Sequence, residues 1–349
     1  MTNDSGLILA VESSCDETAV AVVRDGRRIV ANIVASQVAL HAGTGGIVPE
    51  VAARAHLRWM IPVLDQARRQ AGIRDWSELE AVAVTEGPGL AGSLLVGITM
   101  AKTLAWLARL PLVPVNHLEG HIYAAWLLDP DEPDKPGPEF PIVALVVSGG
   151  HTFLVEMANH LSYRLLGQTV DDAAGEAFDK VGRLLGLPYP GGPAIQRAAE
   201  GAQLRDRRFP RAWLGETFDF SFSGLKTAAR RQVEEAGQLT DSSVAELAYG
   251  FQDSVVDVLA TKTIRAAQAA GARTIILGGG VAANSVLRER VAAGAQSLGL
   301  PLVVPRPGLC TDNAAMIGAA GFFRARAGTR ADSSLEARPS LKLAVAQPA

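Results

Sequence analysis

The stretch GLILAVESSCDETAVAVV at residues 6–23 decides the fold of this chain. An apolar run of strand length leads into the polar turn ESSCDET, and a second apolar run follows, which predicts a strand, a tight turn and a strand. The stretch IVALVVSGGHTFLVE at residues 142–156 has the same form. Two such hairpins predict a duplicated α/β chain in which one hairpin opens each half.

The segment between the hairpins, DPDEPDKPGPEFP at residues 129–141, is too rich in proline and acid for a helix or a central strand. We therefore expect it to link two lobes. The predicted N-terminal lobe takes residues 1–128 and 311–330, and the predicted C-terminal lobe takes residues 142–310. The polar residues 331–349 are expected to form a loose tail.

Alternating strands and helices elsewhere in the chain indicate α/β layers. Helices are expected over 49–71, 92–109, 117–128, 171–186, 193–200, 223–236 and 242–270, from about 284, and from Asp312 to about Arg326. Strands are expected over 80–85, 111–115, 273–277 and 302–304.

Composition bounds the function classes. The 349 residues are 48% hydrophobic, which is enough for two cores. The formal net charge of -3 argues against binding nucleic acid by overall charge, so such a partner would need a local basic patch. Only Cys15 and Cys310 are present, which excludes a disulfide framework. With no signal-peptide pattern and no apolar stretch as long as a membrane span, we expect a soluble cytoplasmic protein without a membrane partner.

His117 and His121 stand four residues apart in HLEGH. On a helix, side chains at this spacing face the same way, with Cβ atoms about 5–6 Å apart, which suits two imidazoles on one ion. The motif differs from the HExxH motif of zinc proteases because Glu119 stands at the third position. Two histidines on a half-buried helix are the alternative interpretation.

Asp312 stands in CTDNAA at residues 310–315, where a strand and loop lead into a helix. An aspartate there is often only an N-cap. Together with the two histidines it would complete a triad with open positions, typical of non-haem Fe²⁺ and possible for zinc. We therefore predict one divalent metal ion per subunit, with Fe²⁺ favoured and Zn²⁺ possible, although spacing alone does not bring Asp312 to His117.

Three strand ends carry turns that fit an anion. They are ESSCDET at 12–18, SGGHT at 148–152 and the glycines at 278–280. Backbone N–H groups at such turns and at helix starts bind phosphates. Neither a GxGxxG fingerprint with its downstream acid nor a GxxxxGK[ST] loop is present, so neither a Rossmann site nor a P-loop is supported. Each of the two hairpin turns alone is better explained as an ordinary hairpin, but the three glycine turns together fit a nucleotide held between two lobes.

Taken jointly, ten motifs resemble one family. VESSCDET, GGIVPE, GPGL, HLEGH, VSGGHT, DDAAGEAFDK, YPGGP, FSFSGLKT, GGGVAAN and CTDNAAMIG occur in the order typical of the TsaD family, the tRNA N6-adenosine threonylcarbamoyltransferases. These motifs cover about residues 7–325. The resemblance implies the two-lobed actin-like ATPase (ASKHA) fold, built from duplicated ribonuclease-H-like domains.

The resemblance also implies an acyltransferase. It would move the threonylcarbamoyl group of threonylcarbamoyl-AMP to the N6 amine of adenosine 37 in tRNAs that read ANN codons. The product would be threonylcarbamoyladenosine (t6A), and AMP would leave. By motif, the metal ligands would be His117, His121 and Asp312. The substrate-binding residues implied are Val146, Val147, Ser148, Gly149, Gly150, Asp179, Gly192 and Asn284. We add Glu12 or Asp16 as the group that takes the proton of the adenine amine.

The implied partners are tRNA, a TsaB-like paralogue in a heterodimer and a TsaE-like ATPase. One local cluster of basic residues is formed by Arg205, Arg207, Arg208 and Arg211, with Lys226, Arg230 and Arg231 nearby in sequence. These residues are more simply explained as solvated charges than as a tRNA patch. Three alternatives stay open: a metalloprotease, an ATP-dependent small-molecule kinase of the same fold, and a non-catalytic nucleotide-binding protein. The kinase would need no histidine-bound metal, and the protease would leave the three turns unused.

Overall fold

The computed structural model describes residues 6–44, 46–206 and 208–343. Contacts divide these residues into two compact units. Unit 1 holds residues 6–138 and 305–343, and unit 2 holds residues 139–304.

The first boundary, after residue 138, falls inside the expected linker 129–141 and beyond the expected end of the N-terminal lobe at residue 128, because residues 129–138 pack on unit 1. Arg28 donates hydrogen bonds of 3.0, 2.9 and 2.8 Å to the carbonyl oxygens of Asp129, Pro130 and Glu132. The second boundary lies earlier than expected, since Arg306 forms an ion pair of 2.5 Å with Asp129. An acidic, proline-rich composition therefore excludes helix and central strand here but does not exclude ordered packing.

Unit 1 is built on a five-stranded sheet of order β3-β2-β1-β4-β5. Strand β1 pairs antiparallel with β2 and parallel with β4, and β3 extends the antiparallel side. The strands are β1 (Leu7–Glu12), β2 (Glu17–Arg24), β3 (Arg28–Ser36), β4 (Ala81–Gly87) and β5 (Leu112–Asn116). The α-helices are α1 (Val38–His41), α2 (Pro49–Gln70), α3 (Ala91–Ala108), α4 (His117–Tyr123), α10 (Pro307–Cys310) and α11 (Ala314–Arg326). Short 3₁₀ helices are η1 (Trp76–Glu78) and η2 (Ala124–Trp126).

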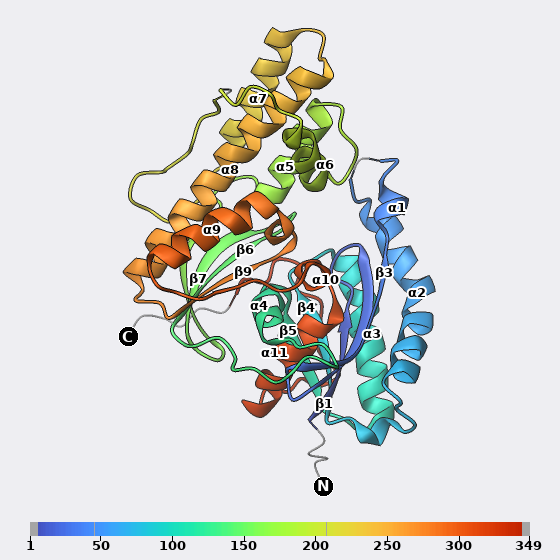
Figure 1. The fold of residues 1–349 in the computed structure, drawn as a ribbon. Helices are drawn as coiled ribbons and strands as arrows, with labels where there is room; N and C mark the ends of the chain where they lie inside the picture. The colour runs from blue at the N-terminus through green and yellow to red at the C-terminus, as the bar shows by residue number, and fades with distance from the viewer. Residues whose placement is uncertain (1–5, 45, 207, 344–349) are drawn as a thin grey trace. The chain divides into compact units, whose positions relative to one another are not determined.

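Unit 2 repeats this topology. Its sheet has the order β10-β9-β6-β7-β8, in which β6 pairs antiparallel with β7 and parallel with β9. The strands are β6 (Ile142–Val147), β7 (Thr152–Asn159), β8 (Ser162–Gln168), β9 (Thr274–Gly278) and β10 (Leu302–Val303). The helices are α5 (Ala174–Leu184), α6 (Gly191–Glu200), α7 (Ser223–Ala236), α8 (Asp241–Ala269), η3 (Gly280–Ala283) and α9 (Ser285–Ser297). The same strand order and directions in both units confirm the duplicated α/β fold (Figure 1).

The central strands of unit 1 are apolar along their whole length because helices cover both faces of the sheet. Helices α2 and α3 pack on one face and α11 on the other, as Figure 1 shows. Helix α3 is long and apolar enough to cross a membrane by length and composition, contrary to the expectation from the sequence. Seven of its side chains are buried in unit 1, among them Leu94, Ile98 and Leu104, so its apolar character matches a core-facing helix.

The sequence patterns missed two strands and misjudged the tail. Strands β3 and β8, the third of each sheet, were not expected, because each has a mixed pattern of buried and partly exposed residues.

Residues 331–343 are not loose but lie along unit 1. The Lys102 Nζ donates to the Leu335 carbonyl at 3.0 Å, and the Gly89 N–H donates to the Pro339 carbonyl at 3.1 Å. Residues 344–349 of the expected tail lie outside the described residues.

Candidate metal centre

Helix α4 carries both histidines, with His117 as its first residue and His121 one turn later. It starts directly after β5, and Asn116 caps it by accepting a hydrogen bond of 2.9 Å from the Leu118 N–H. Every residue of this short helix is buried. His117 and His121 therefore lie one turn apart on a rigid element, as their spacing predicts.

Asp312 reaches the histidines because a neighbouring residue caps the next helix. The N-cap of α11 is Asn313, whose side chain accepts from the Met316 N–H at 3.1 Å. The N-cap interpretation of Asp312 is therefore wrong. Helix α11 packs closely on α4 at Gly120, where an added Cβ would lie 2.8 Å from Ile317 Cδ1. The glycine of HLEGH thus permits the contact that brings Asp312 to α4.

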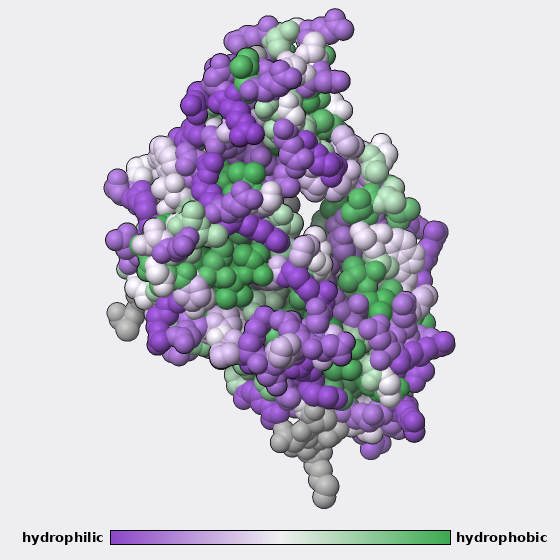
Figure 2. Space-filling view, viewed as in Figure 1, coloured by the Kyte–Doolittle hydropathy of each residue, from purple (hydrophilic) through white to green (hydrophobic). Residues whose placement is uncertain are grey.

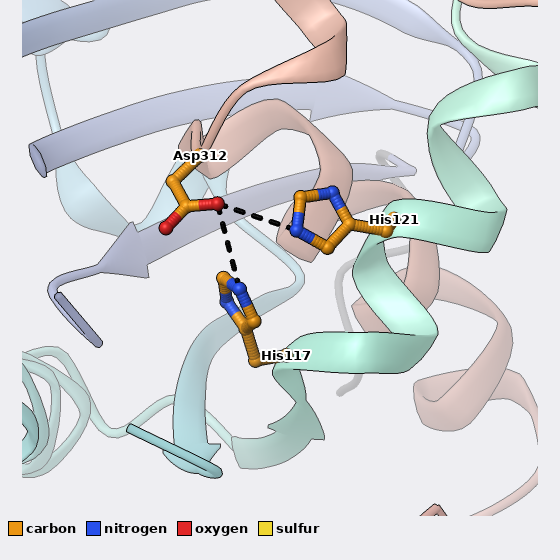
Figure 3. Close-up of side chains that lie close together, drawn as sticks. All are labelled: His117, His121 and Asp312. Atoms are coloured by element: carbon orange, nitrogen blue, oxygen red, sulfur yellow. Dashed lines mark ion pairs between the residues drawn. The ribbon is translucent and has the colours of Figure 1, made fainter. Parts of the chain in front are cut away.

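The three side chains point toward one another (Figure 3). Asp312 Oδ1 lies 3.2 Å from His121 Nε2 and 3.5 Å from His117 Nε2. The ligand atoms of all three residues lie within 4.8 Å of one another. The side chain of Asp312 is 19% exposed, whereas those of the histidines are 7% and 0% exposed, so the cluster opens to solvent on the aspartate side.

These distances fit a metal ion. Two ligand atoms that each lie about 2.1 Å from a shared ion are themselves about 3.0–3.4 Å apart. The two contacts of Asp312 match this separation, whereas ligand atoms as far apart as 4.8 Å must draw closer around the ion. Among the described residues, neither ring nitrogen of the buried His121 has a hydrogen-bond partner, because its contact with Asp312 is close but lacks hydrogen-bond geometry. A buried polar atom without a partner is costly, and coordination of an ion would satisfy Nε2. The residues present therefore fit one divalent ion with open positions.

Glu12 stands behind His117. Its Oε2 lies 3.0 Å from His117 Nδ1 and accepts a hydrogen bond of 2.6 Å from the Thr85 hydroxyl, and its Oε1 accepts one of 2.5 Å from the Ser14 N–H. The carboxylate is fully buried. Metal-ligating histidines commonly donate their second N–H to such a carboxylate, which fixes the tautomer and the ring orientation.

Charge pairing at this site overrides the effect of burial. Burial alone would raise the pKa of Glu12, but the charge and hydrogen bond of His117 lower it. Burial would also raise the pKa of Asp312, but His117 holds it well below its usual range. Burial would lower the pKa of His117, yet the two carboxylates raise it well above its ordinary value.

Three more acids of the motifs, Glu119, Asp16 and Glu17, lie outside the His117–His121–Asp312 cluster. Glu119 is fully buried and forms an ion pair with Arg324. It therefore has a structural role and cannot act as a zinc-protease base. Asp16 lies in the turn after β1 and is 8% exposed. Next to it, burial and then the charges of Asp312 and Asp16 raise the pKa of Glu17 to about 10. A carboxyl group that keeps its proton beside Asp16 was not foreseen from the sequence.

In unit 2, two of the predicted turns lie side by side at the carboxyl ends of β6 and β9, because Val146 pairs with Gly278. Val146 and Val147 are themselves fully buried, backbone included, so a ligand contact by these two residues stays a prediction. Gly149 and Gly150 have open space where a Cβ would stand. The SGGHT turn and the triple glycine therefore share one edge of the sheet, where parallel α/β sheets bind ligands.

The remaining predicted substrate residues are partly engaged in the fold. Asp179 Oδ1 accepts a hydrogen bond of 2.7 Å from the Gly191 N–H at the start of α6. Gly192, next along, has open space at its Cβ position. Asn284 caps α9 by accepting from the Leu287 N–H at 3.0 Å and donates to Gln252 Oε1 at 2.8 Å. A ligand contact by these two side chains stays a prediction.

Three of the basic residues singled out in the sequence, Arg211, Lys226 and Arg230, form ion pairs with acids. Arg211 forms ion pairs with Asp253 and Asp257, and Arg230 pairs with Glu234. Arg207 lies outside the described residues. These pairs favour the interpretation as solvated or structural charges, and the contacts with tRNA remain to be located.

Comparison with known proteins gives a consistent result. The family model described as TsaD, tRNA N6-adenosine threonylcarbamoyltransferase, matches residues 28–319. A tRNA N6-adenosine threonylcarbamoyltransferase of Thermomicrobium roseum is 56% identical, over 97% of each chain, and that of Symbiobacterium thermophilum is 53% identical, over 97% of this chain and 98% of its own.

Solved structures share the fold at low sequence identity. The nucleotide-bound form of full-length HypF aligns with a TM-score of 0.59 at 14% identity, over 92% of this chain and 46% of HypF. Component A of the (R)-2-hydroxyglutaryl-CoA dehydratase of Acidaminococcus fermentans aligns with a TM-score of 0.51 at 13% identity, over 92% of this chain and 99% of its own. These likenesses support the actin-like ATPase fold, and they say nothing about the reaction.

Proposed function

Because the chain belongs to the tRNA N6-adenosine threonylcarbamoyltransferase family, we propose that unit 1 supplies its metal centre and unit 2 its phosphate contacts. The reaction moves the threonylcarbamoyl group of threonylcarbamoyl-AMP to the N6 amine of adenosine 37 in tRNA and releases AMP. The observation that carries the metal assignment is the convergence of His117, His121 and Asp312, with two unsatisfied ring nitrogens on His121.

His117, His121 and Asp312 hold one divalent ion, Fe²⁺ in preference to Zn²⁺ because two histidines and a carboxylate with open positions are typical of the former. When bound, this ion supplies a Lewis acid and a template for oriented oxygen ligands. The partly exposed Asp312 leaves the approach open, and the buried histidines keep water from the rest of the site.

For Glu12, which the sequence suggested as a proton acceptor, we now favour a role in orienting His117. Its oxygens already accept bonds from Thr85 and the Ser14 N–H and face His117, and the carboxylate is fully buried, so it is not exposed to an incoming substrate. Asp16 is then the remaining candidate for the general base. If Asp16→Asn kept full turnover with an unchanged pH profile, that role would be excluded.

We predict that Glu12→Gln weakens metal binding about 10- to 100-fold, because the amide cannot stabilise the donating tautomer of His117 as a carboxylate does. Metal affinity is measured by competition with a chelator of known affinity. Thr85→Val is the matched control, since it removes one hydrogen bond from Glu12 and keeps the carboxylate; its effect should be smaller. Unchanged affinity in Glu12→Gln, together with lost turnover, would restore the proton-acceptor role.

In unit 2, the N–H groups of Gly149 and Gly150 and of the glycines at 279–280 hold the phosphate of the departing AMP, since the Ser148 N–H already donates to the His151 carbonyl at 2.8 Å. The open space at Gly149, Gly150 and Gly280 lets an anion approach the backbone closely. Fixed N–H dipoles stabilise the negative charge that develops on the leaving phosphate. The adenine amine is a weak nucleophile, so positioning supplies much of the rate.

The activity is tested by incubating the protein with tRNA, threonine, bicarbonate, ATP and its partner proteins, followed by nucleoside mass spectrometry. Threonylcarbamoyladenosine is expected. Its absence with demonstrably active partners would refute the function, and metal-dependent cleavage of a denatured polypeptide would instead favour a metalloprotease.

We propose that the reaction takes place in the cytoplasm and that the chain acts with a TsaB-like paralogue and a TsaE-like ATPase, as the family resemblance implies. Helices α2 and α3, which pack together, expose Leu57, Ile61 and Leu95 at 67%, 58% and 58%. Figure 2 shows patches of apolar surface between polar ones, and apolar patches lie also over α1 and α2. Clustered exposed apolar side chains mark interaction surfaces, and we assign this one to the paralogue.

The double substitution Leu57→Asp and Ile61→Asp is expected to weaken association with the paralogue about 100-fold or more, because it places charge in an apolar contact. Titration calorimetry or analytical ultracentrifugation measures this effect. Trp106→Asp is the control, since Trp106 is 80% exposed near the other end of α3. Equal weakening by both variants would contradict this assignment of the surface.

A further inference from the structure

A buried histidine outside the metal centre holds the turn between β1 and β2. His56 of α2 is fully buried, and its Nε2 lies 3.0 Å from the carbonyl oxygen of Cys15. Its Nδ1 lies 2.7 Å from the hydroxyl oxygen of Thr18. The ring thus links Cys15, in the turn that carries Asp16, to Thr18 at the start of β2. HLEGH drew attention to other histidines, and no motif pointed to this one.

The partners of His56 settle its tautomer. A carbonyl oxygen only accepts, so Nε2 carries the hydrogen and donates to Cys15, and Nδ1 accepts from the Thr18 hydroxyl. Burial lowers the pKa of His56 despite the hydrogen bond to Cys15, which keeps the ring neutral at neutral pH. Gln37 Nε2 lies 3.5 Å from His56 Nε2 but donates to the Ala52 carbonyl at 3.3 Å, so donors and acceptors agree throughout.

Gln37 ties the same turn to a second buried histidine. Its backbone N–H donates to the Asp16 carbonyl at 2.9 Å. Its Oε1 accepts from His41 Nε2 at 3.2 Å, and His41 Nδ1 in turn accepts from the Val48 N–H at 3.4 Å. Gln37 and His41 are both fully buried. Each contact in this network pairs a donor with an acceptor, the condition under which a buried polar network rigidifies its surroundings.

We propose that His56 is a positioning residue for threonylcarbamoyl transfer, which together with Thr18 and Gln37 holds the Cys15–Asp16 turn in its reactive conformation. The carbonyls of both turn residues are fixed by this network, one by His56 and the other by Gln37. The turn follows Glu12, which contacts the metal ligand His117. The catalytic part of the proposal rests on the proposed function, whereas the structural part does not.

Cys15 offers a direct reporter of the turn. It is half-buried, and burial and then the charges of Asp312 and Asp16 raise the pKa of its thiol, so alkylation of the closed turn is slow. The chain has one other cysteine, Cys310, which is fully buried. The rate of alkylation by iodoacetamide, followed by mass spectrometry of the peptide that contains Cys15, therefore measures how often the turn opens.

Purified protein is compared as wild type, His56→Leu, His56→Gln and Thr18→Val, with His160→Leu of unit 2 as the control for loss of a histidine. His56→Leu is expected to raise the alkylation rate of Cys15 about tenfold, the factor that matches one lost buried hydrogen bond, while Cys310 stays unmodified. It should lower kcat about as much and leave KM for tRNA and metal content unchanged. His56→Gln, which keeps a donor for Cys15, should restore both values in part.

If His56→Leu does not fold, Thr18→Val carries the test, because valine has nearly the shape of threonine and removes only the hydroxyl. Wild-type alkylation rates in the folded variants would overturn the structural part. Faster alkylation with unchanged kcat would overturn the catalytic part. A wild type that forms no threonylcarbamoyladenosine with active partners would refute the proposed function alone, because the alkylation rates would still report on the turn.

Discussion

His121→Ala should lose the bound divalent ion and lower threonylcarbamoyl transfer by about a hundredfold or more, as expected when a catalytic metal loses one of three protein ligands. The ring of His121 is fully buried, and its nitrogens have no hydrogen-bond partner among the described residues, so coordination is its evident use. The alanine also leaves His117 and Asp312 as the remaining pair, 3.5 Å apart, which can neutralise each other without an ion.

Elemental analysis of dialysed protein, together with the nucleoside assay, measures both effects. The same analysis of the wild type distinguishes iron from zinc. His160→Ala is a suitable control, because His160 belongs to unit 2 and contacts the ring of Phe140. Equal metal content in His121→Ala and wild type would refute this metal site.

Gly279→Ala should destabilise unit 2 by roughly 3 kcal/mol or more, because two costs add at this position. The backbone of Gly279 has φ 84° and ψ 166°, a region that only glycine adopts readily. An added Cβ would also lie 2.4 Å from the carbonyl oxygen of Val147, a backbone atom that cannot move aside without disturbing β6.

Gly280→Ala is the matched control, since nothing lies within 4 Å of its added Cβ. We expect it to change the free energy of unfolding by less than about 1 kcal/mol. Chemical denaturation followed by circular dichroism compares the two variants. Similar losses of stability in both would show that the close approach of β6 and β9 at this edge does not require a glycine.

Much of the secondary structure followed from local patterns. The expected helix at 223–236 has the bounds of α7, Ser223–Ala236, and the expected helix at 242–270 differs from α8 by one residue at each end. The strands β3 and β8 were missed because they lie toward the antiparallel side of each sheet, where burial is uneven and the apolar signal is weak.

The metal ligands show the same limit at the level of the site. The spacing of His117 and His121 predicts a shared face because both lie within one turn of one helix. That Asp312 meets them depends on the capping of α11 by Asn313 and on the close packing of α11 against α4 at Gly120. The cap joins residues only three positions apart, but the packing of α11 on α4 is not visible in a local pattern, since these two helices are far apart in the chain.

The sequence by itself determined that this chain is a duplicated α/β protein, which family it resembles, and that HLEGH presents two histidines on one face. Tertiary structure alone decided that Asp312 completes the cluster, that Glu12 stands behind His117, and that His56 holds the Cys15–Asp16 turn. The physical reason is the separation along the chain over which each kind of interaction acts. Periodicity and capping act between residues a few positions apart, whereas coordination and buried hydrogen bonds join residues that only the packing of sheets and helices brings together.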